Sequence, residues 1–499
     1  MSQQIEVGPS PTQAPTPTSV PPRRAMLLGL CGLFAIWVLV MPPFAGSDEH
    51  DHAYRAAAAA RGQWAIDPVD ATRGTGAFLT VPSDIVDAAR VECQNLIYTE
   101  DRDCVGKPGG EETVVASGAG RYHPLFYAVI GTAAKPFDGS AALYMMRIAT
   151  ALLSAAFVWM AARAAQTWAR TRWPYLGIAV ACTPVAIYSC TVAAPNGLEM
   201  MAALALWMSL IGLLQAPPEH IRRLAAFAAV SGAVLSTLRP MGPFWCLVTL
   251  GAVLLCIRAE RGRVKELLRR PAVLAGAGLV LLSALQSTAW VLAVGALEVG
   301  IDGSGHSSLG HRMWVSAIQL PAWTFQTIAA FPLRDVPTHT SVYVCYLFLF
   351  IAVVALGLRA GHVRARITIV LLTVGVLLFP YVTTVNSYDR YGTAWQGRYA
   401  LPVAMGIAVL AAHSLDRSGL RLRGPMQLSL FMLFVVAQTV SPAYTLLREI
   451  KVSPQVDTAA WVQPSLTLTI VLAGLSSALM WWGAFGQDLP KKDQVRAEA

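Results

Sequence analysis

The chain has 499 residues, of which 55% are hydrophobic and only 13% are charged. A soluble globular domain carries roughly 25% charged residues, so this composition excludes an ordinary soluble enzyme and indicates a polytopic membrane protein. The net charge of +9 does not indicate nucleic-acid binding, because the basic residues gather in short segments between apolar runs.

The chain begins with a Pro-, Ser-, Thr- and Gln-rich segment at 1–24 that has too few hydrophobic side chains to fold. We expect it to be a disordered cytoplasmic tail. An apolar run of about 20 residues follows, which is the length that a membrane-spanning helix needs. This run lacks the small-residue cleavage site of a signal peptide, so we expect it to stay in the protein as the first helix.

Similar apolar runs recur along the whole chain. They lie at 25–45, 141–166, 174–194, 197–215, 224–238, 242–257, 272–296, 341–358, 367–385, 399–413, 426–447 and 464–485. The expected fold class is therefore an all-α polytopic membrane protein with about 12 transmembrane helices. The membrane domain covers 25–485, and a second cytoplasmic tail follows at 486–499.

The basic segments set the expected topology. If the N-terminus is cytoplasmic, every basic loop falls on the cytoplasmic side, as the positive-inside rule requires. Segments 46–140, 297–340 and 386–398 then face the outside, and the first is the largest. It holds Cys93 and Cys104, and in an oxidising compartment these two residues can form a disulfide.

The first outer segment opens with five ionisable residues at 48–52, where the lipid ends. On a helix Asp48, His52 and Arg55 share one face, and a carboxylate beside an imidazole can act as a general base. Asp48 is the first candidate for this base and Glu49 the second. A helix cap is the structural alternative.

A divalent cation is another alternative for this stretch. Asp48, His50 and His52 offer suitable ligand types, but the spacing supplies no further partner, so no metal site is assigned.

Four ionisable residues fall near the outer ends of their predicted helices: Arg147, Glu199, Arg239 and Arg398. This layout predicts a polar chamber at the outer face and disfavours a proton-coupled transporter, which needs carboxylates near the midplane. Arg398 stands in an aromatic-rich stretch at 386–402. It is suited to hold an anionic head group while the aromatic rings stack on sugar or lipid. The alternative is an aromatic belt with snorkelling arginines.

The start of the first outer segment resembles that of bacterial polytopic membrane proteins with a P-D-E-x-x-H motif. That group carries a domain of unknown function and is related to the GT-C superfamily of membrane glycosyltransferases. Asp48, Glu49 and His52 match the motif, while Ser47 stands in place of its proline.

Two further motifs carry the resemblance, which spans residues 25 to about 413. The Q-G-R-Y-x-L-P motif of the group matches residues 396–402 fully, and its H-P-P-L-Y-Y stretch resembles 123–127. One departure is Asn196, which stands where the group often has Asp. The resemblance implies donor-phosphate or substrate binding at the motif positions His123, Asn196, Gln396, Arg398 and Tyr399. Arg239 and Arg147, selected for their places near outer helix ends, are expected to supply further positive charge for the donor phosphate.

GT-C enzymes take sugar from a polyprenyl-phosphate donor and have a catalytic carboxylate in the first outer loop. The resemblance therefore implies an inverting glycosyltransferase in a bacterial plasma membrane, with a glycan or lipid of the cell envelope as acceptor. Two alternatives stay open at this point. One is a transporter or flippase of a lipid-linked saccharide, and the other is a non-catalytic scaffold for envelope assembly.

Overall fold

A computed structural model describes most of the chain. The described residues are 23–46, 48–65, 76–94, 104–107, 111–258, 260–296, 307–331, 336–420, 422, 424–452 and 460–485. The predicted tails at 1–24 and 486–499 fall outside this set, apart from residues 23 and 24.

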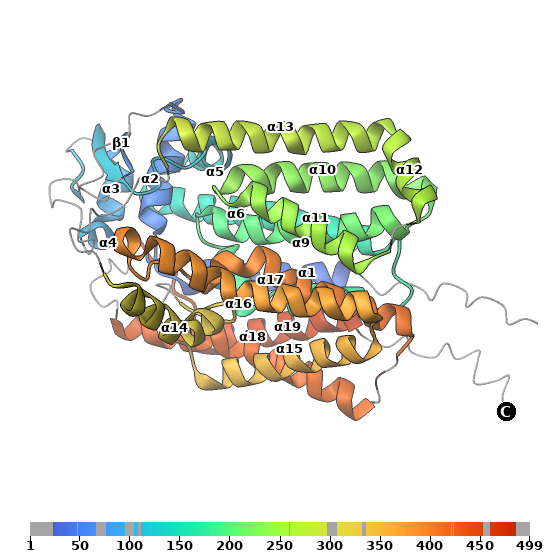
Figure 1. Ribbon diagram of the computed structural model, residues 1–499. Coiled ribbons are helices and arrows are strands. Elements are labelled where there is room, and N and C mark those ends of the chain that lie inside the picture. The colour runs from blue at the N-terminus through green and yellow to red at the C-terminus, as the bar shows by residue number, and fades with distance from the viewer. Residues whose placement is uncertain are drawn as a thin grey trace, which may run out of the picture.

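Long helices run roughly alongside one another through the molecule (Figure 1). Nine helices of the described residues are long and apolar enough to cross a membrane. They are α6 (Gly139–Ala165), α9 (Pro195–Gln215), α10 (Ile221–Leu238, extended by η3 at Pro218–His220), α13 (Pro271–Ala293), α15 (Thr340–Ala360), α16 (Val363–Tyr391), α17 (Leu401–Ser418, extended by η4 at Gly397–Ala400), α18 (Gly424–Val452) and α19 (Leu466–Phe485). The fold class expected from the sequence, an all-α polytopic membrane protein, is confirmed.

The remaining predicted spans form shorter helices. The first is α1 (Arg23–Val40), and α11 (Gly242–Cys256) follows the break after α10. The prediction of a single span over 174–194 is wrong, because this stretch forms α7 (Trp173–Ala181) and α8 (Pro184–Ser189). Pro184 has no N–H for a continuing helix, and the Thr183 side chain instead accepts a bond from the Ala186 amide and starts α8.

The buried core of the bundle lies around α9 and α17, whose side chains are almost all buried. Trp207 of α9 donates to the Pro402 carbonyl over 3.0 Å, and its ring lies against Gly406. In contrast, Ser287 is the one residue of α13 that is buried. Helix α13 therefore lies at the edge of the bundle, as Figure 1 also shows.

The first outer segment folds into a small layer at one end of the bundle (Figure 1). It consists of α2 (Glu49–Ala60), β1 (Ala77–Pro82), α3 (Ser83–Ala88), α4 (Arg90–Gln94), β2 (Glu112–Ser117) and α5 (Pro124–Ala134). The strands pair antiparallel, with Ala77 opposite Ser117 and Pro82 opposite Glu112. The short helix α12 (Arg261–Arg269) lies at the other end of the bundle, and α14 (Leu309–Gln326) lies beside α16 at the end that carries the layer.

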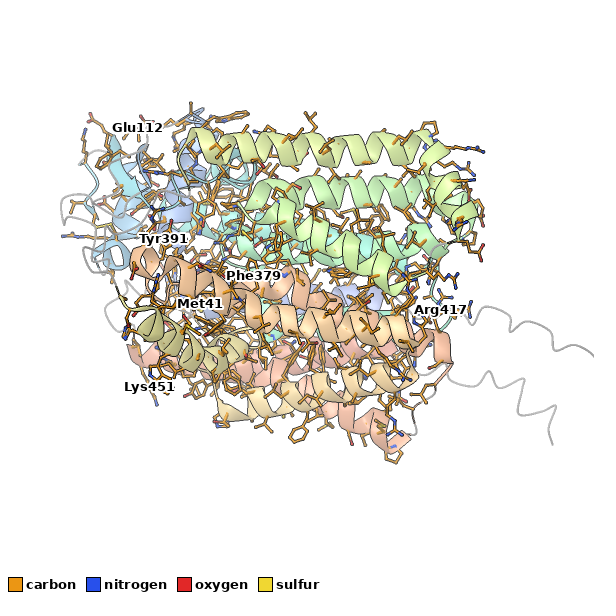
Figure 2. All side chains as sticks on the ribbon, in the orientation of Figure 1. Met41, Glu112, Phe379, Tyr391, Arg417 and Lys451 are labelled. Carbon is orange, nitrogen blue, oxygen red and sulfur yellow. A yellow bond between two sulfur atoms is a disulfide. The ribbon has the colours of Figure 1, made fainter. Side chains whose placement is uncertain are left out.

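Individual side chains mark the same two ends of the bundle. Figure 2 shows Glu112 of β2 and Tyr391 at the end of α16 near the small layer, with Arg417 of α17 at the opposite end of the bundle. The outer chamber is predicted at the end of the bundle that carries α2 and α5. Its residues are therefore expected beneath these two helices, where the long helices end.

Candidate functional site

Asp48 lies directly before α2. Its backbone is left-handed, with φ 54° and ψ 21°, a conformation that costs most L-residues about 1–2 kcal/mol and that Asp tolerates better than most. Its side chain makes no capping bond with the amides of α2. The carboxylate lies instead 4.0 Å from Nη2 of Arg398 and is 29% exposed. The position is thus that of a helix cap, but the side chain is directed to another part of the protein.

Glu49 belongs to a closed ion pair inside the protein. Its two carboxylate oxygens accept bonds of 2.8 and 2.6 Å from Arg147 of α6, and both side chains are essentially unexposed. The backbone amide of Ala193 donates to the same carboxylate over 3.0 Å. Arg147 also donates to three carbonyls that follow or end α1, those of Val38, Met41 and Pro42. Glu49 therefore joins α2 to α1 and α6.

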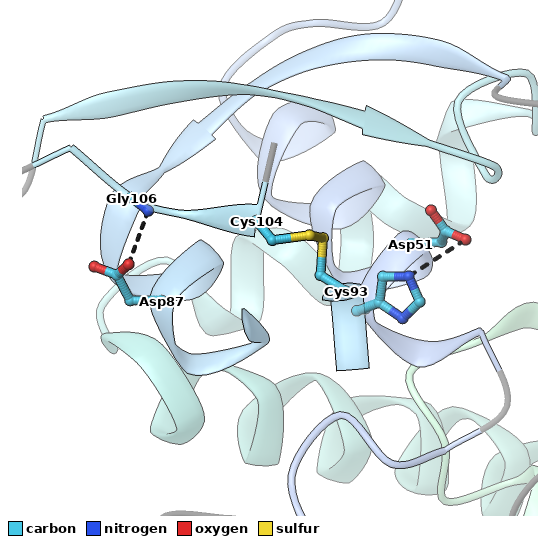
Figure 3. Close-up of a disulfide and its surroundings, with 6 residues drawn as sticks. Asp51, Asp87, Cys93, Cys104 and Gly106 are labelled. Atoms are coloured by element: carbon cyan, nitrogen blue, oxygen red, sulfur yellow. Dashed lines mark hydrogen bonds and ion pairs between the residues drawn. A yellow bond between two sulfur atoms is a disulfide. The ribbon is translucent and has the colours of Figure 1, made fainter. Parts of the chain in front are cut away.

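The next two acidic and basic residues of the motif bind to each other and to the small layer. Nε2 of His50 lies 3.6 Å from the Asp51 carboxylate. Figure 3 shows this contact as a dashed line to the labelled Asp51. Asp51 also accepts a 2.7 Å bond from the Gly118 amide, and its carbonyl accepts a bond from the Ser117 hydroxyl. Asp51 therefore fixes the loop that follows β2.

His52 lies on the other side of α2 from this contact with the loop. Its Nδ1 forms a 2.8 Å hydrogen bond with the Tyr127 hydroxyl, and the two rings stack at 5.8 Å. Burial, followed by the positive charges of Arg239 and Arg398 and by His50, holds the pKa of His52 well below its usual range. The imidazole is therefore neutral at neutral pH.

The metal alternative of the sequence gains no geometric support from these positions. No group of three or more His, Cys, Asp or Glu side chains in the described part of the chain is arranged to hold a metal ion. Asp48, His50 and His52 make separate contacts, although all three stand within five positions of one another.

Two arginines meet around one tyrosine at the outer end of the bundle. The Arg239 guanidinium lies 4.3 Å from the centre of the Tyr399 ring, and the Arg398 guanidinium lies 5.7 Å from it. Arg239 also donates to Oδ1 of Asn196. We call Asp48, Asn196, Arg239, Arg398 and Tyr399 the outer cluster. It brings together five of the residues that the sequence analysis selected.

The hydrogen-bond partners of Arg239 in the described part of the chain are the Asn196 side-chain oxygen, the Tyr122 hydroxyl at 3.1 Å and Tyr399. None of them is a carboxylate, and no described carboxylate forms an ion pair with Arg239. Glu199 of α9, buried at 2% exposure, interacts electrostatically with both Arg239 and Arg398. The outer cluster therefore combines two cations with the part-exposed acid Asp48, and the buried acid Glu199 lies within electrostatic range of both cations.

Gln396 and His123 lie near the outer cluster in different ways. Gln396 is buried beside Arg398, and its Oε1 has no hydrogen-bond partner among the described residues. His123 begins α5, where Nδ1 accepts from the Leu125 amide, and its Nε2 bonds to Gln286. His123 lines a cavity that also includes Tyr122 and Arg239, so it lies next to the cluster and not within it.

The expected disulfide is confirmed. Cys93 and Cys104 are bonded, with 5.6 Å between their Cα atoms. Figure 3 shows the bond beside the two strands, with Asp87 accepting a bond from the Gly106 amide nearby. The disulfide thus closes the small layer around α4.

Sequence reasoning did not select several residues that shape the site. Tyr122 directly precedes the motif at 123–127 and Tyr127 is its last residue, and this proximity is a usable signal. Ser287 and Trp290 line the cavity, but in the sequence they are ordinary members of an apolar run. Only their positions in space give them a possible role.

Comparison with known proteins places the chain in a family of predicted membrane proteins. The model of a family described as predicted membrane protein (DUF2142) matches residues 31–407. No curated protein matches the chain. Among solved structures, the crystal structure of ArnT from Cupriavidus metallidurans bound to undecaprenyl phosphate is similar over 93% of this chain and 78% of that chain. Its TM-score is 0.40 and its sequence identity is 13%.

Proposed function

We propose that this chain, which belongs to the DUF2142 family of predicted membrane proteins, is a GT-C-type glycosyltransferase at the outer face of a bacterial plasma membrane. It transfers a sugar from a polyprenyl-phosphate donor to a glycan or lipid acceptor of the cell envelope. The observation that carries the proposal is the Asp48 carboxylate, which stands on a left-handed backbone 4.0 Å from Arg398.

Asp48 is the general base of the proposed reaction. It takes the proton from the acceptor hydroxyl, whose oxygen attacks the anomeric carbon of the donor sugar. The bond between that carbon and the phosphate oxygen breaks, and polyprenyl phosphate leaves with the electron pair. A single displacement inverts the anomeric configuration. An acceptor can reach the Asp48 side chain, which is 29% exposed. It cannot reach the Glu49 side chain, which is buried.

The arginines stabilise the leaving group. A departing phosphate gains negative charge, and fixed cations at that point lower the barrier. The guanidinium groups of Arg239 and Arg398 both lie against the Tyr399 ring. Nε of Arg398 is buried without a hydrogen-bond partner among the described residues, and a buried polar group left in this state costs about 1–3 kcal/mol. A phosphate oxygen would satisfy it.

Gln396 supports the same assignment of the donor. Its Oε1 is also buried and without a partner in the described part of the chain, two residues before Arg398. A sugar hydroxyl can donate to this oxygen. Gln396 and Arg398 together therefore suit a ligand that carries a hydroxyl group close to a phosphate.

A transporter of lipid-linked saccharides is the second candidate function. It would use the same arginines to bind the donor but would have no use for a base. The strained backbone at Asp48 favours the enzyme, because strained residues cluster where chemistry takes place.

The test is transfer from a panel of radiolabelled polyprenyl-phosphate sugars by membranes that contain the chain. We expect Asp48→Asn to lower the transfer rate by about 10²–10⁴-fold, the usual contribution of general acid–base catalysis. Binding of the same donor to the purified variant stays within a few-fold of wild type. Asp138→Asn is the matched control, because Asp138 is exposed and precedes α6 without capping it.

Two results would overturn the proposal. If Asp48→Asn transfers sugar as fast as wild type, Asp48 is not the base. If no donor supports transfer, yet one binds and crosses the bilayer of vesicles whatever residue stands at position 48, the chain is a transporter. A chain that neither transfers nor moves a donor would instead be a scaffold.

A further inference from the structure

A cavity of about 180 Å³ adjoins the outer cluster. It lies between the start of α5, the turn that joins α10 to α11, and the outer part of α13. A water molecule takes up about 30 Å³ in the liquid, so the cavity has room for a group of several heavy atoms. We propose that it binds one sugar ring that carries an anionic group. This inference rests on the proposed function and names its substrate class.

Ser287 gives the first indication of a ligand. It is the one buried residue of α13, whose other side chains are exposed or half-buried, and it lines the cavity. A hydroxyl can both donate and accept a hydrogen bond, so Ser287 can pair with a hydroxyl of a sugar that occupies the cavity.

Two aromatic side chains line the same space in fixed positions. Nε1 of Trp290 donates to the Arg121 carbonyl over 3.0 Å, and the indole and the His123 ring meet edge to face. The Tyr122 hydroxyl accepts from Arg239. With its polar atom engaged, the Trp290 ring offers apolar surface to the C–H groups of a sugar.

The charge of the lining determines the class of sugar. Arg121, His123 and Arg239 line the cavity, and no Asp or Glu is among its lining residues. Arg239 donates to the side-chain oxygen of Asn196 and not to an acid, so no carboxylate in the described part of the chain is hydrogen-bonded to it. A carboxylate or phosphate on the sugar can therefore interact favourably with Arg239.

Helix α2 connects the cavity to the proposed base. Asp48 stands directly before α2, and Asp51 in its first turn holds Gly118, which belongs to the cavity wall. Arg239 belongs to both the cluster and the cavity. A sugar ring in the cavity would thus lie next to the cation that we assign to the donor phosphate.

The test measures binding without any transfer reaction. The full chain, purified in detergent, is titrated with methyl β-D-glucuronide, and saturation-transfer NMR reports the bound ligand. Methyl β-D-glucoside is the neutral control of the same size, and sn-glycerol 3-phosphate represents a phospholipid head group. The variants are Ser287→Phe, which fills the cavity, and Thr288→Phe, which adds the same ring at an exposed neighbour.

A third variant, Asn196→Asp, changes the charge with almost no change of shape. Its new carboxylate neutralises Arg239, so we expect the affinity for the glucuronide to fall at least tenfold while the weak affinity for the glucoside stays the same. Ser287→Phe abolishes glucuronide binding, and Thr288→Phe leaves it unchanged. Because Asn196→Asp does not fill space, it keeps the proposal testable if Ser287→Phe fails to fold.

Three results would overturn the inference. If neither Ser287→Phe nor Asn196→Asp changes the affinity for the glucuronide, the ligand binds elsewhere. If glucoside and glucuronide bind equally well, the site does not select an anionic sugar. Displacement of the glucuronide by glycerol phosphate at lower concentration, again lost in Ser287→Phe, assigns the cavity to a lipid head group.

The inference and the proposed function can fail separately, and the binding assay distinguishes the two failures. The wild-type chain should bind the glucuronide, and Ser287→Phe should abolish this binding, whether or not the chain transfers sugar. Where transfer is measurable, Ser287→Phe tells which substrate brings the ring. The KM for the donor rises if the ring belongs to the donor, and the KM for the acceptor rises if it belongs to the acceptor.

Discussion

Asp48 and Glu49 are neighbours in the chain, yet their carboxylates meet opposite surroundings. Asp48 is part-exposed beside Arg398, whereas Glu49 is buried against Arg147. The sequence could select the acidic pair but could only rank its members. The left-handed backbone at Asp48 separates them, because it turns adjacent side chains in different directions. A positive φ angle at a residue other than glycine is not indicated by any clear sequence pattern.

The buried ion pair of Glu49 and Arg147 predicts that a second substitution restores part of the stability lost through the first. Arg147→Met leaves the Glu49 charge buried and unpaired, which should destabilise the protein by about 3–5 kcal/mol. Adding Glu49→Gln removes that charge, while the Gln oxygen can still accept from the Ala193 amide. We therefore expect the double variant to melt at a higher temperature in detergent than Arg147→Met alone.

The measurement is thermal unfolding of the two variants and wild type under the same conditions. If the double variant is less stable than Arg147→Met, the hydrogen bonds of Glu49 to the backbone outweigh its charge. Our account of the pair would then be wrong.

At the scale of elements, α2 shows why its alanines matter. Its run of alanines favours a helix, and the helix covers Glu49–Ala60. The structure adds that α2 packs closely on α5. A Cβ on Gly131 of α5 would lie only 2.0 Å from the Ala56 carbonyl oxygen. Small residues on both helices allow this approach, which places His52 against Tyr127.

Two glycine substitutions should therefore have opposite effects. Gly131→Ala forces α2 and α5 apart and should cost about 1–3 kcal/mol, as overpacking usually does. Gly251→Ala in α11 meets nothing within 4 Å and should stabilise by about 0.5–1 kcal/mol, because alanine favours a helix over glycine. Melting temperatures in detergent compare the two variants. A Gly131→Ala protein as stable as Gly251→Ala would show that the helices separate easily.

Other elements show where sequence reasoning stops. Apolar run length predicts the long helices well, because spanning a membrane depends on length and composition alone. It failed at 174–194, where hydropathy hides the break before Pro184. The contact of Arg239 with Asn196, and the Ser287 and Trp290 positions in one cavity, depend on packing between helices far apart in the chain. No local pattern encodes such contacts.

At the scale of the whole molecule, charge and structure divide the bundle in the same way. The outer cluster and the small layer lie at one end, and the basic helix α12 lies at the other (Figure 1). The sequence could predict this division because positive charge near helix ends is a one-dimensional property that membrane insertion uses directly. The orientation itself, with α12 in the cytoplasm, stays a prediction.

Labelling of single cysteines tests that orientation. Gly262 in α12 and Gly310 in α14 each have open space where a side chain would begin, so a cysteine at either position should not disturb the fold. With a membrane-impermeant maleimide, we expect Gly310→Cys to react in intact spheroplasts and Gly262→Cys to react only after permeabilisation. The wild-type chain gives the background of its native cysteines. The reverse pattern would place Asp48 in the cytoplasm and exclude a reaction at the outer face.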